Sequence, residues 1–186
     1  MTIDAEDRSI PIGWAALLGI LLVAPLVAAL IWLHALVRGP AAIGGAIDAL
    51  LARPLVGVAL LAAGIVSHEL VHAAVWACAG GGGWGRVRFG WNWKALAPFA
   101  HYTHPMPANA YRLGAVAPLV LLGVGPAVAG TLAGWGGVAA FGWLLTAGAA
   151  GDLAVLWLLR GIPPSALVAD HPSRAGCLVH ARPASE

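Results

Sequence analysis

The chain has 186 residues, of which 60% are hydrophobic and only 10% are charged, and its mean hydropathy is +0.85. These values lie far outside the range of soluble globular proteins and predict an integral membrane protein embedded in a lipid bilayer. The net charge is only +2 and no basic cluster typical of nucleic-acid binding occurs, so nucleic acid is excluded as a partner.

Four apolar segments are long enough to cross a hydrocarbon layer of about 30 Å. They comprise residues 12–37, 54–79, 113–133 and 137–160. The third contains Pro118 and Pro126 among several glycines, which predicts a kinked or partly broken helix. The predicted fold is therefore an all-α membrane protein with four transmembrane helices, organised as one membrane-embedded domain over residues 1–186.

The lysine and arginine residues predict how these helices are oriented. Most of them fall on one side of a four-span chain, and positive residues in short loops remain in the cytoplasm. Both termini, the loop 80–112 and the tail 161–186 are therefore expected to be cytoplasmic. The first segment is too long and its flank too acidic for a signal peptide, so this span is expected to be retained.

The loop contains a strand-like pattern, because apolar and polar residues alternate from Arg86 to Lys94. A second extended stretch, residues 99–104, can return antiparallel, which predicts a short cytoplasmic β-hairpin between the second and third helices. Three aromatic residues of this hairpin are candidates for substrate binding along a strand edge or for anchoring the loop among lipid headgroups. They are Phe89, Trp91 and Trp93.

The second apolar segment contains the motif His68-Glu69-Leu70-Val71-His72. Residues four apart share one face of a helix, so His68 and His72 can bind the same metal ion while Glu69 stands beside it as a base. Two histidines and a glutamate are costly in hydrocarbon unless they are paired, metal-bound or exposed to a wet cavity. The motif therefore predicts a zinc site with Glu69 as the catalytic residue.

Catalytic zinc usually has three protein ligands and a water position, so one ligand is missing from the motif. The fourth segment contains a single carboxylate, Asp152. At 1.5 Å per residue, His72 and Asp152 lie about 10 and 12 Å before the predicted cytoplasmic ends of their helices, at nearly the same depth. Asp152 is therefore the expected third ligand. The alternatives, all in the loop or tail, are His101, His104, Asp170 and His171.

These residues together resemble a family of small prokaryotic membrane proteins described as putative zincin peptidases, which is allied to the site-2 intramembrane metalloproteases. The resemblance rests on residues 68–73, on Tyr111-Arg112 leading to Pro118, on Gly151-Asp152 and on residues 170–173. It implies a prokaryotic cell membrane, His68, His72 and Asp152 as zinc ligands and Glu69 as general base.

The expected function is an intramembrane zinc metalloprotease that hydrolyses peptide bonds of membrane-protein or peptide substrates near the cytoplasmic face. Two alternatives remain at this point. One is a catalytically silent membrane adaptor that binds metal without cleaving anything. The other is a metal or ion transporter that uses the same polar residues as a pathway.

Overall fold

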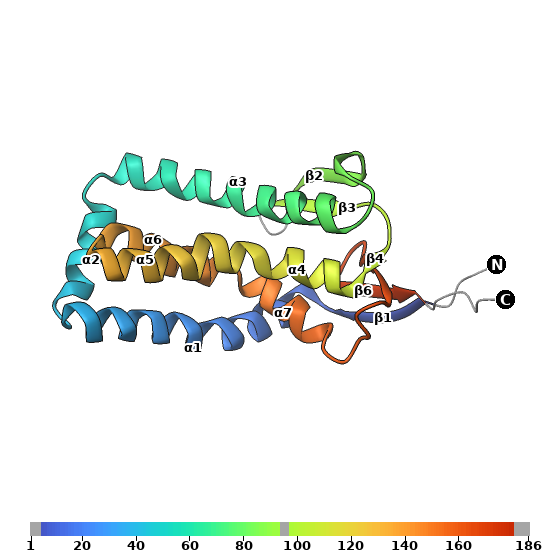
Figure 1. The fold of residues 1–186 in the computed structure, drawn as a ribbon, viewed down its shortest axis with the longest axis horizontal. Coiled ribbons are helices and arrows are strands. Elements are labelled where there is room, and N and C mark those ends of the chain that lie inside the picture. Colours follow the sequence, from blue (N-terminus) through green and yellow to red (C-terminus); the bar gives the residue numbers. More distant parts are fainter. Residues whose placement is uncertain (1–4, 94–96, 181–186) are drawn as a thin grey trace.

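The computed structural model describes residues 5–93 and 97–180, and it is mostly helical (Figure 1). The helices are α1 (Ile12–Arg38), α2 (Ala42–Leu51), α3 (Pro54–Ala79), a 3₁₀ turn η1 (Trp84–Arg86), α4 (Ala108–Pro118), a π-helical stretch η2 (Leu119–Val124), α5 (Gly125–Ala133), α6 (Gly136–Gly148) and α7 (Ala150–Leu158). The strands are β1 (Ala5–Ile10), β2 (Val87–Asn92), β3 (Ala97–Tyr102), β4 (Met106–Pro107), β5 (Leu167–Asp170) and β6 (Ala175–His180).

Three helices are long and apolar enough to cross a membrane: α1, α3 and the continuous run 108–133 formed by α4, η2 and α5. They indicate a membrane protein. The α6–α7 pair is bent by 43° and counts as a fourth span only if both helices are taken together. The predicted count of four transmembrane helices and the orientation of the termini therefore stay predictions.

The third apolar segment is one helix and not a broken one. It begins at Ala108, directly after Pro107, and so includes residues that we had predicted to belong to the loop. Pro118 lacks an amide hydrogen and disturbs the regular hydrogen-bond ladder. The chain responds with the π-helical stretch that follows this proline, and the helix then continues to Ala133.

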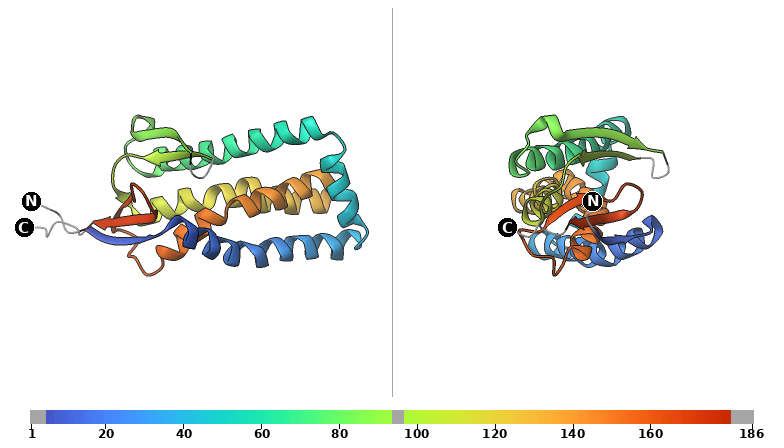
Figure 2. Two further views of the ribbon diagram at one scale, coloured as in Figure 1. Left: turned by 180° about the vertical axis from the view of Figure 1, so that it is seen from behind. Right: turned by 90° about the vertical axis from the view of Figure 1, so that its right-hand side faces the viewer.

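The fold is mostly helical, and the described residues also form two small antiparallel sheets where the sequence predicted a single hairpin. One consists of β2 and β3, with Val87 opposite Tyr102. The other has four strands in the order β1-β6-β5-β4 and unites the N-terminal flank with the predicted tail. Both sheets lie at the same end of the helical bundle, and α2 lies at the opposite end (Figures 1 and 2). Pairing between strands so distant in the chain leaves little local signal in a sequence.

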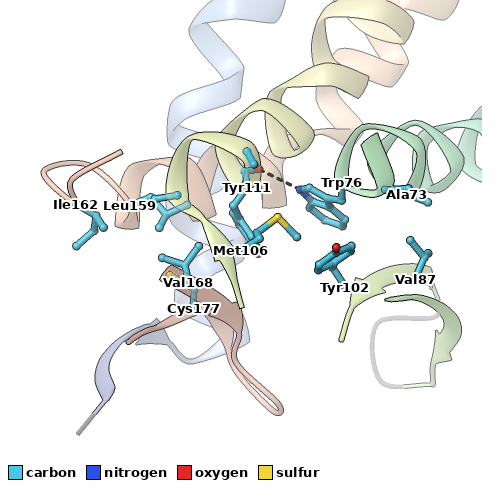
Figure 3. Close-up of a cluster of buried hydrophobic side chains, with 13 residues drawn as sticks. Ala73, Trp76, Val87, Tyr102, Met106, Tyr111, Leu159, Ile162, Val168 and Cys177 are labelled. Atoms are coloured by element: carbon cyan, nitrogen blue, oxygen red, sulfur yellow. Dashed lines mark hydrogen bonds between the residues drawn. The ribbon is translucent and has the colours of Figure 1, made fainter. Parts of the chain in front are cut away.

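A buried cluster joins the sheet end of the molecule to the C-terminal part of α3 (Figure 3). Its largest fully buried members are Tyr102, Met106, Leu159, Val168 and Cys177. They come from β3, β4, the segment after α7, β5 and β6. The cluster therefore packs both sheets against the part of α3 that follows the His-Glu-Leu-Val-His motif.

Candidate metal centre

Helix α3 places the three polar residues of the motif in one group. His68, Glu69 and His72 each offer a ligand atom, and these atoms all lie within 4.8 Å of one another. The two imidazole rings are 4.7 Å apart between centroids. This proximity follows from the helical repeat, since residues at i and i+4 stand one above the other on the same face.

Asp152 lies against both histidines. Its Oδ2 is 2.9 Å from Nε2 of His68, and its Oδ1 is 3.2 Å from Nε2 of His72. The side chain comes from the first turn of α7, immediately after the bend that separates α6 from α7. Helix α7 thus directs one carboxylate at two imidazole nitrogens that belong to another helix.

The donor set fits a zinc ion. Tetrahedral zinc with ligand bonds of about 2.0–2.1 Å separates its ligand atoms from one another by about 3.3 Å. The nitrogen-to-oxygen distances of 2.9 and 3.2 Å at Asp152 are close to this spacing. Two imidazoles and one carboxylate are also among the ligand sets that leave a fourth position open.

The orientation of His72 is fixed by contacts with α4. Its Nδ1 donates to the carbonyl oxygen of Gly114 at 2.9 Å, so Nε2 is the nitrogen that presents a lone pair when the ring is neutral. The ring also stacks on Trp76, with centroids 5.0 Å apart. Gly114 is required here, because a Cβ at this position would lie 2.0 Å from Nε1 of Trp76.

Glu69 is held by a strand and faces a cavity. Its Oε2 accepts a hydrogen bond from the backbone amide of Ala100 in β3 at 2.6 Å. Beside it is a cavity of about 190 Å³. The cavity is lined by Ile65, His68, Glu69, Pro98, Leu145 and Gly148. It has room for a water molecule and part of a substrate next to the carboxylate.

The four alternative ligands from the loop and tail have other partners. His101 Nδ1 binds Oδ2 of Asp170 at 2.6 Å, which raises the pKa of this histidine above its ordinary value. His104 Nδ1 contacts the hydroxyl of Thr103, and His171 Nδ1 accepts two backbone amides of the turn after β5. Among residues 5–93 and 97–180, no group of three or more potential ligands was found apart from the motif on α3, whose histidines Asp152 contacts.

Of the predicted substrate-binding residues, two lie in β2 and the third follows its end, away from the buried core. Phe89, Trp91 and Trp93 are all exposed, and the two tryptophan rings meet edge to face at 6.0 Å. Arg112 of α4 donates hydrogen bonds to the carbonyl oxygens of Leu159 and Ile162 after α7. Arg112 therefore connects α4 to the segment that follows α7.

Two contributors to the site escaped the sequence analysis because they act through backbone atoms. The carbonyl of Gly114 and the amide of Ala100 carry no side-chain chemistry that a pattern could reveal. The glycine at position 114 was a weak signal, since an isolated glycine within a helix often marks a close approach of another group.

A family model described as putative zincin peptidase matches residues 61–167. The chain belongs to this family. The matched residues of the zincin peptidase include the whole motif on α3, Gly114 and Asp152, and they end before Asp170. Membership indicates a metallopeptidase and implies zinc, in agreement with the ligand group on α3. None of the curated proteins and none of the solved structures matches the chain.

Proposed function

We propose that this zincin peptidase is an intramembrane zinc metalloprotease, in which His68, His72 and Asp152 bind the metal and Glu69 is the catalytic base. The observation that carries the proposal is the convergence of one carboxylate from α7 on two imidazoles of α3, with Glu69 beside them. Metal binding alone does not require a glutamate between the histidines, so its presence favours an enzyme over a silent adaptor.

Zinc bound by these ligands supplies Lewis acidity, which polarises a substrate carbonyl and acidifies water. Glu69 accepts and then donates the proton that moves in the reaction. Its Oε2 is engaged by the amide of Ala100, so Oε1 is the oxygen available to accept a proton from the attacking water. The carboxyl group then returns this proton to the nitrogen of the departing amine, and the peptide bond is broken with one water consumed.

Strand β3 offers a place for an extended substrate. The amide of Ala100 points at Glu69 and therefore away from β2, so the edge of β3 that is not paired with β2 faces the motif on α3. A peptide that adds to this edge would form main-chain hydrogen bonds beside the cavity. The exposed aromatic residues Phe89, Trp91 and Trp93 extend the apolar surface on which its side chains can pack.

A location at the cytoplasmic face of a cell membrane is supported by how the chain ends are paired. Strand β1 precedes the first span and β6 follows the last helix, and the two strands pair with each other. This pairing supports an even number of crossings. The basic residues that accompany the same end favour the cytoplasm.

The decisive experiment separates metal binding from chemistry. We expect purified full-length protein to contain about one zinc per chain and to cleave a quenched-fluorescent peptide made of one apolar span with an extended flank. Glu69→Gln should keep the zinc and lose the cleavage, because an amide cannot take the proton of the attacking water. Glu6→Gln, which changes an exposed glutamate outside the helices, is the matched control and should cleave like the native protein.

Three outcomes would contradict parts of this proposal. Native cleavage by Glu69→Gln would remove Glu69 as the base. Full zinc content in a protein with both His68→Ala and His72→Ala would reject the motif as a metal site. A native protein that holds zinc but leaves every span-containing peptide intact would favour a metal-binding adaptor.

A further inference from the structure

Asp170 is a carboxylate at the end of β5 that receives two hydrogen bonds from distant parts of the chain. Its Oδ2 accepts from Nδ1 of His101 in β3 at 2.6 Å. Its Oδ1 accepts from the hydroxyl of Tyr111 in α4. Only about 20% of the Asp170 side chain is exposed, so these two donors satisfy a carboxylate that is mostly removed from water.

The bond between His101 and Asp170 lies next to the contact that holds Glu69, the proposed catalytic base. His101 follows Ala100 directly in β3, and the amide of Ala100 is the group that holds Oε2 of Glu69. Among residues 5–93 and 97–180, only β2 pairs with β3 in a sheet, so a two-stranded ribbon carries this contact. Such a ribbon is marginally stable alone, and packing of Val87 and Tyr102 against α3 supports it. The bond between His101 and Asp170 adds a polar tie one residue away from the contact with Glu69.

The bond between Tyr111 and Asp170 is connected through α4 and Trp76 to His72, a proposed metal ligand. The carbonyl oxygen of Tyr111 accepts a hydrogen bond from Nε1 of Trp76 at 3.1 Å (Figure 3). The ring of Trp76 also stacks on His72. The carbonyl that orients His72 belongs to Gly114, one helical turn after Tyr111 in the same helix α4. A shift of α4 at Tyr111 would therefore change both contacts that set the plane of the His72 ring. These are the stacking of Trp76 and the hydrogen bond to the Gly114 carbonyl.

We propose that Asp170 is a positioning residue that ties β3 to α4 and thereby orients Glu69 and His72 together. It touches neither the metal ligands nor the proposed base, and acts through His101 on one side and Tyr111 on the other. The C-terminal sheet thus becomes part of the catalytic apparatus, although Asp170 lies outside the residues that the family model matches. The inference rests on the proposed function for the roles of Glu69 and His72.

Single-donor variants of the full-length zinc protein test the two branches separately. Tyr111→Phe removes the bond to α4 and should weaken zinc affinity, measured by chelator competition, by about tenfold, the lower end of the effect of losing a direct partner of a metal ligand, because the hydroxyl acts on His72 only through α4 and Trp76. It should leave the hydrogen exchange of β3 near native. His101→Phe removes the bond to β3 and should speed exchange at the amide of Ala100 by about tenfold or more, with zinc affinity near native.

Two further variants complete the test. Asp170→Leu should show both effects, since leucine has a similar size but offers no oxygen to accept from either His101 or Tyr111. His101→Asn is the matched control, because its amide nitrogen occupies the place of Nδ1 along the side chain and can still donate to Asp170. It should restore slow exchange at Ala100.

Neither readout needs a cleavage assay, so the inference and the proposed protease activity can fail independently. Native zinc affinity and native exchange in Asp170→Leu would overturn the inference. Loss of both properties in each of the variants Tyr111→Phe and His101→Phe would overturn it too, because that pattern describes general loosening of the fold. The expected separation of the two effects would not arise from a purely structural role.

Discussion

Replacement of Asp152 by asparagine is the most informative perturbation of the candidate site. The change keeps the size of the side chain and removes its charge, so the packing of α7 is preserved. In the native protein one carboxylate lies 2.9 Å from His68 and 3.2 Å from His72, so it is the nearest anionic group to both imidazole nitrogens. A neutral amide is a poor substitute in a set of zinc ligands.

The expected loss of affinity can be bounded. Removal of a residue that merely supports a metal ligand weakens metal binding by about 10- to 100-fold. A direct ligand should reach or exceed the upper value, so we expect the dissociation constant for zinc to rise at least about 100-fold, equivalent to about 2.7 kcal/mol.

Chelator competition at constant pH measures this change, with Asp48→Asn as the matched control. Asp48 lies exposed on α2, at the end of the bundle opposite the sheets, and its substitution should leave zinc affinity unchanged. A dissociation constant for Asp152→Asn within about threefold of native would refute the assignment of Asp152 as the third ligand. The motif on α3 would then need a ligand from elsewhere.

Three other predictions concern a helix contact, a thiol and the orientation in the membrane. Gly114→Ala should weaken zinc binding and destabilise the protein by about 1–3 kcal/mol, because its Cβ would lie 2.0 Å from an indole nitrogen; native affinity and thermal midpoint would contradict this. Burial raises the pKa of Cys177 to about 11, so the thiol stays protonated well above neutral pH, and maleimide should modify exposed Cys78 but not Cys177 until the protein is denatured. Mass spectrometry checks this, and rapid native labelling of Cys177 would be the opposing result. In a protein lacking both cysteines, a new cysteine at Gly45 should react from outside the cell and one at Gly90 only from the cytoplasm; the reverse would invert the orientation.

Local patterns were sufficient for the parts of this protein that depend on helical geometry. The spacing of His68 and His72 decides that they share a face, whatever surrounds the helix. The bounds of α1 and α3 follow from uninterrupted apolar runs, and the structure has helices at residues 12–38 and 54–79 where 12–37 and 54–79 were predicted. Asp152 could be predicted to lie at the depth of the motif, because the number of residues between a group and the end of its helix gives its depth in the membrane.

The groups that complete the site depend on pairing between distant segments. Ala100 meets Glu69 across 31 positions of the chain, and Gly114 meets His72 across 42. Both contribute backbone atoms, which are identical at every residue and leave no trace in a pattern of side chains. Only the fold could reveal which amide and which carbonyl lie at the candidate metal centre.

Asp170 shows the same limit for a side chain. A polar residue after a Pro-Pro break usually belongs to a solvated tail, and from the sequence Asp170 was only one of four alternative metal ligands. Its partners His101 and Tyr111 lie 69 and 59 positions earlier, both within residues 80–112, which the sequence predicted to be a loop. The strand that carries Asp170 exists because β6 and β4 flank it. Its function as a positioning residue is therefore a property of the C-terminal sheet, which brings one carboxylate within reach of both segments that support the proposed catalytic groups.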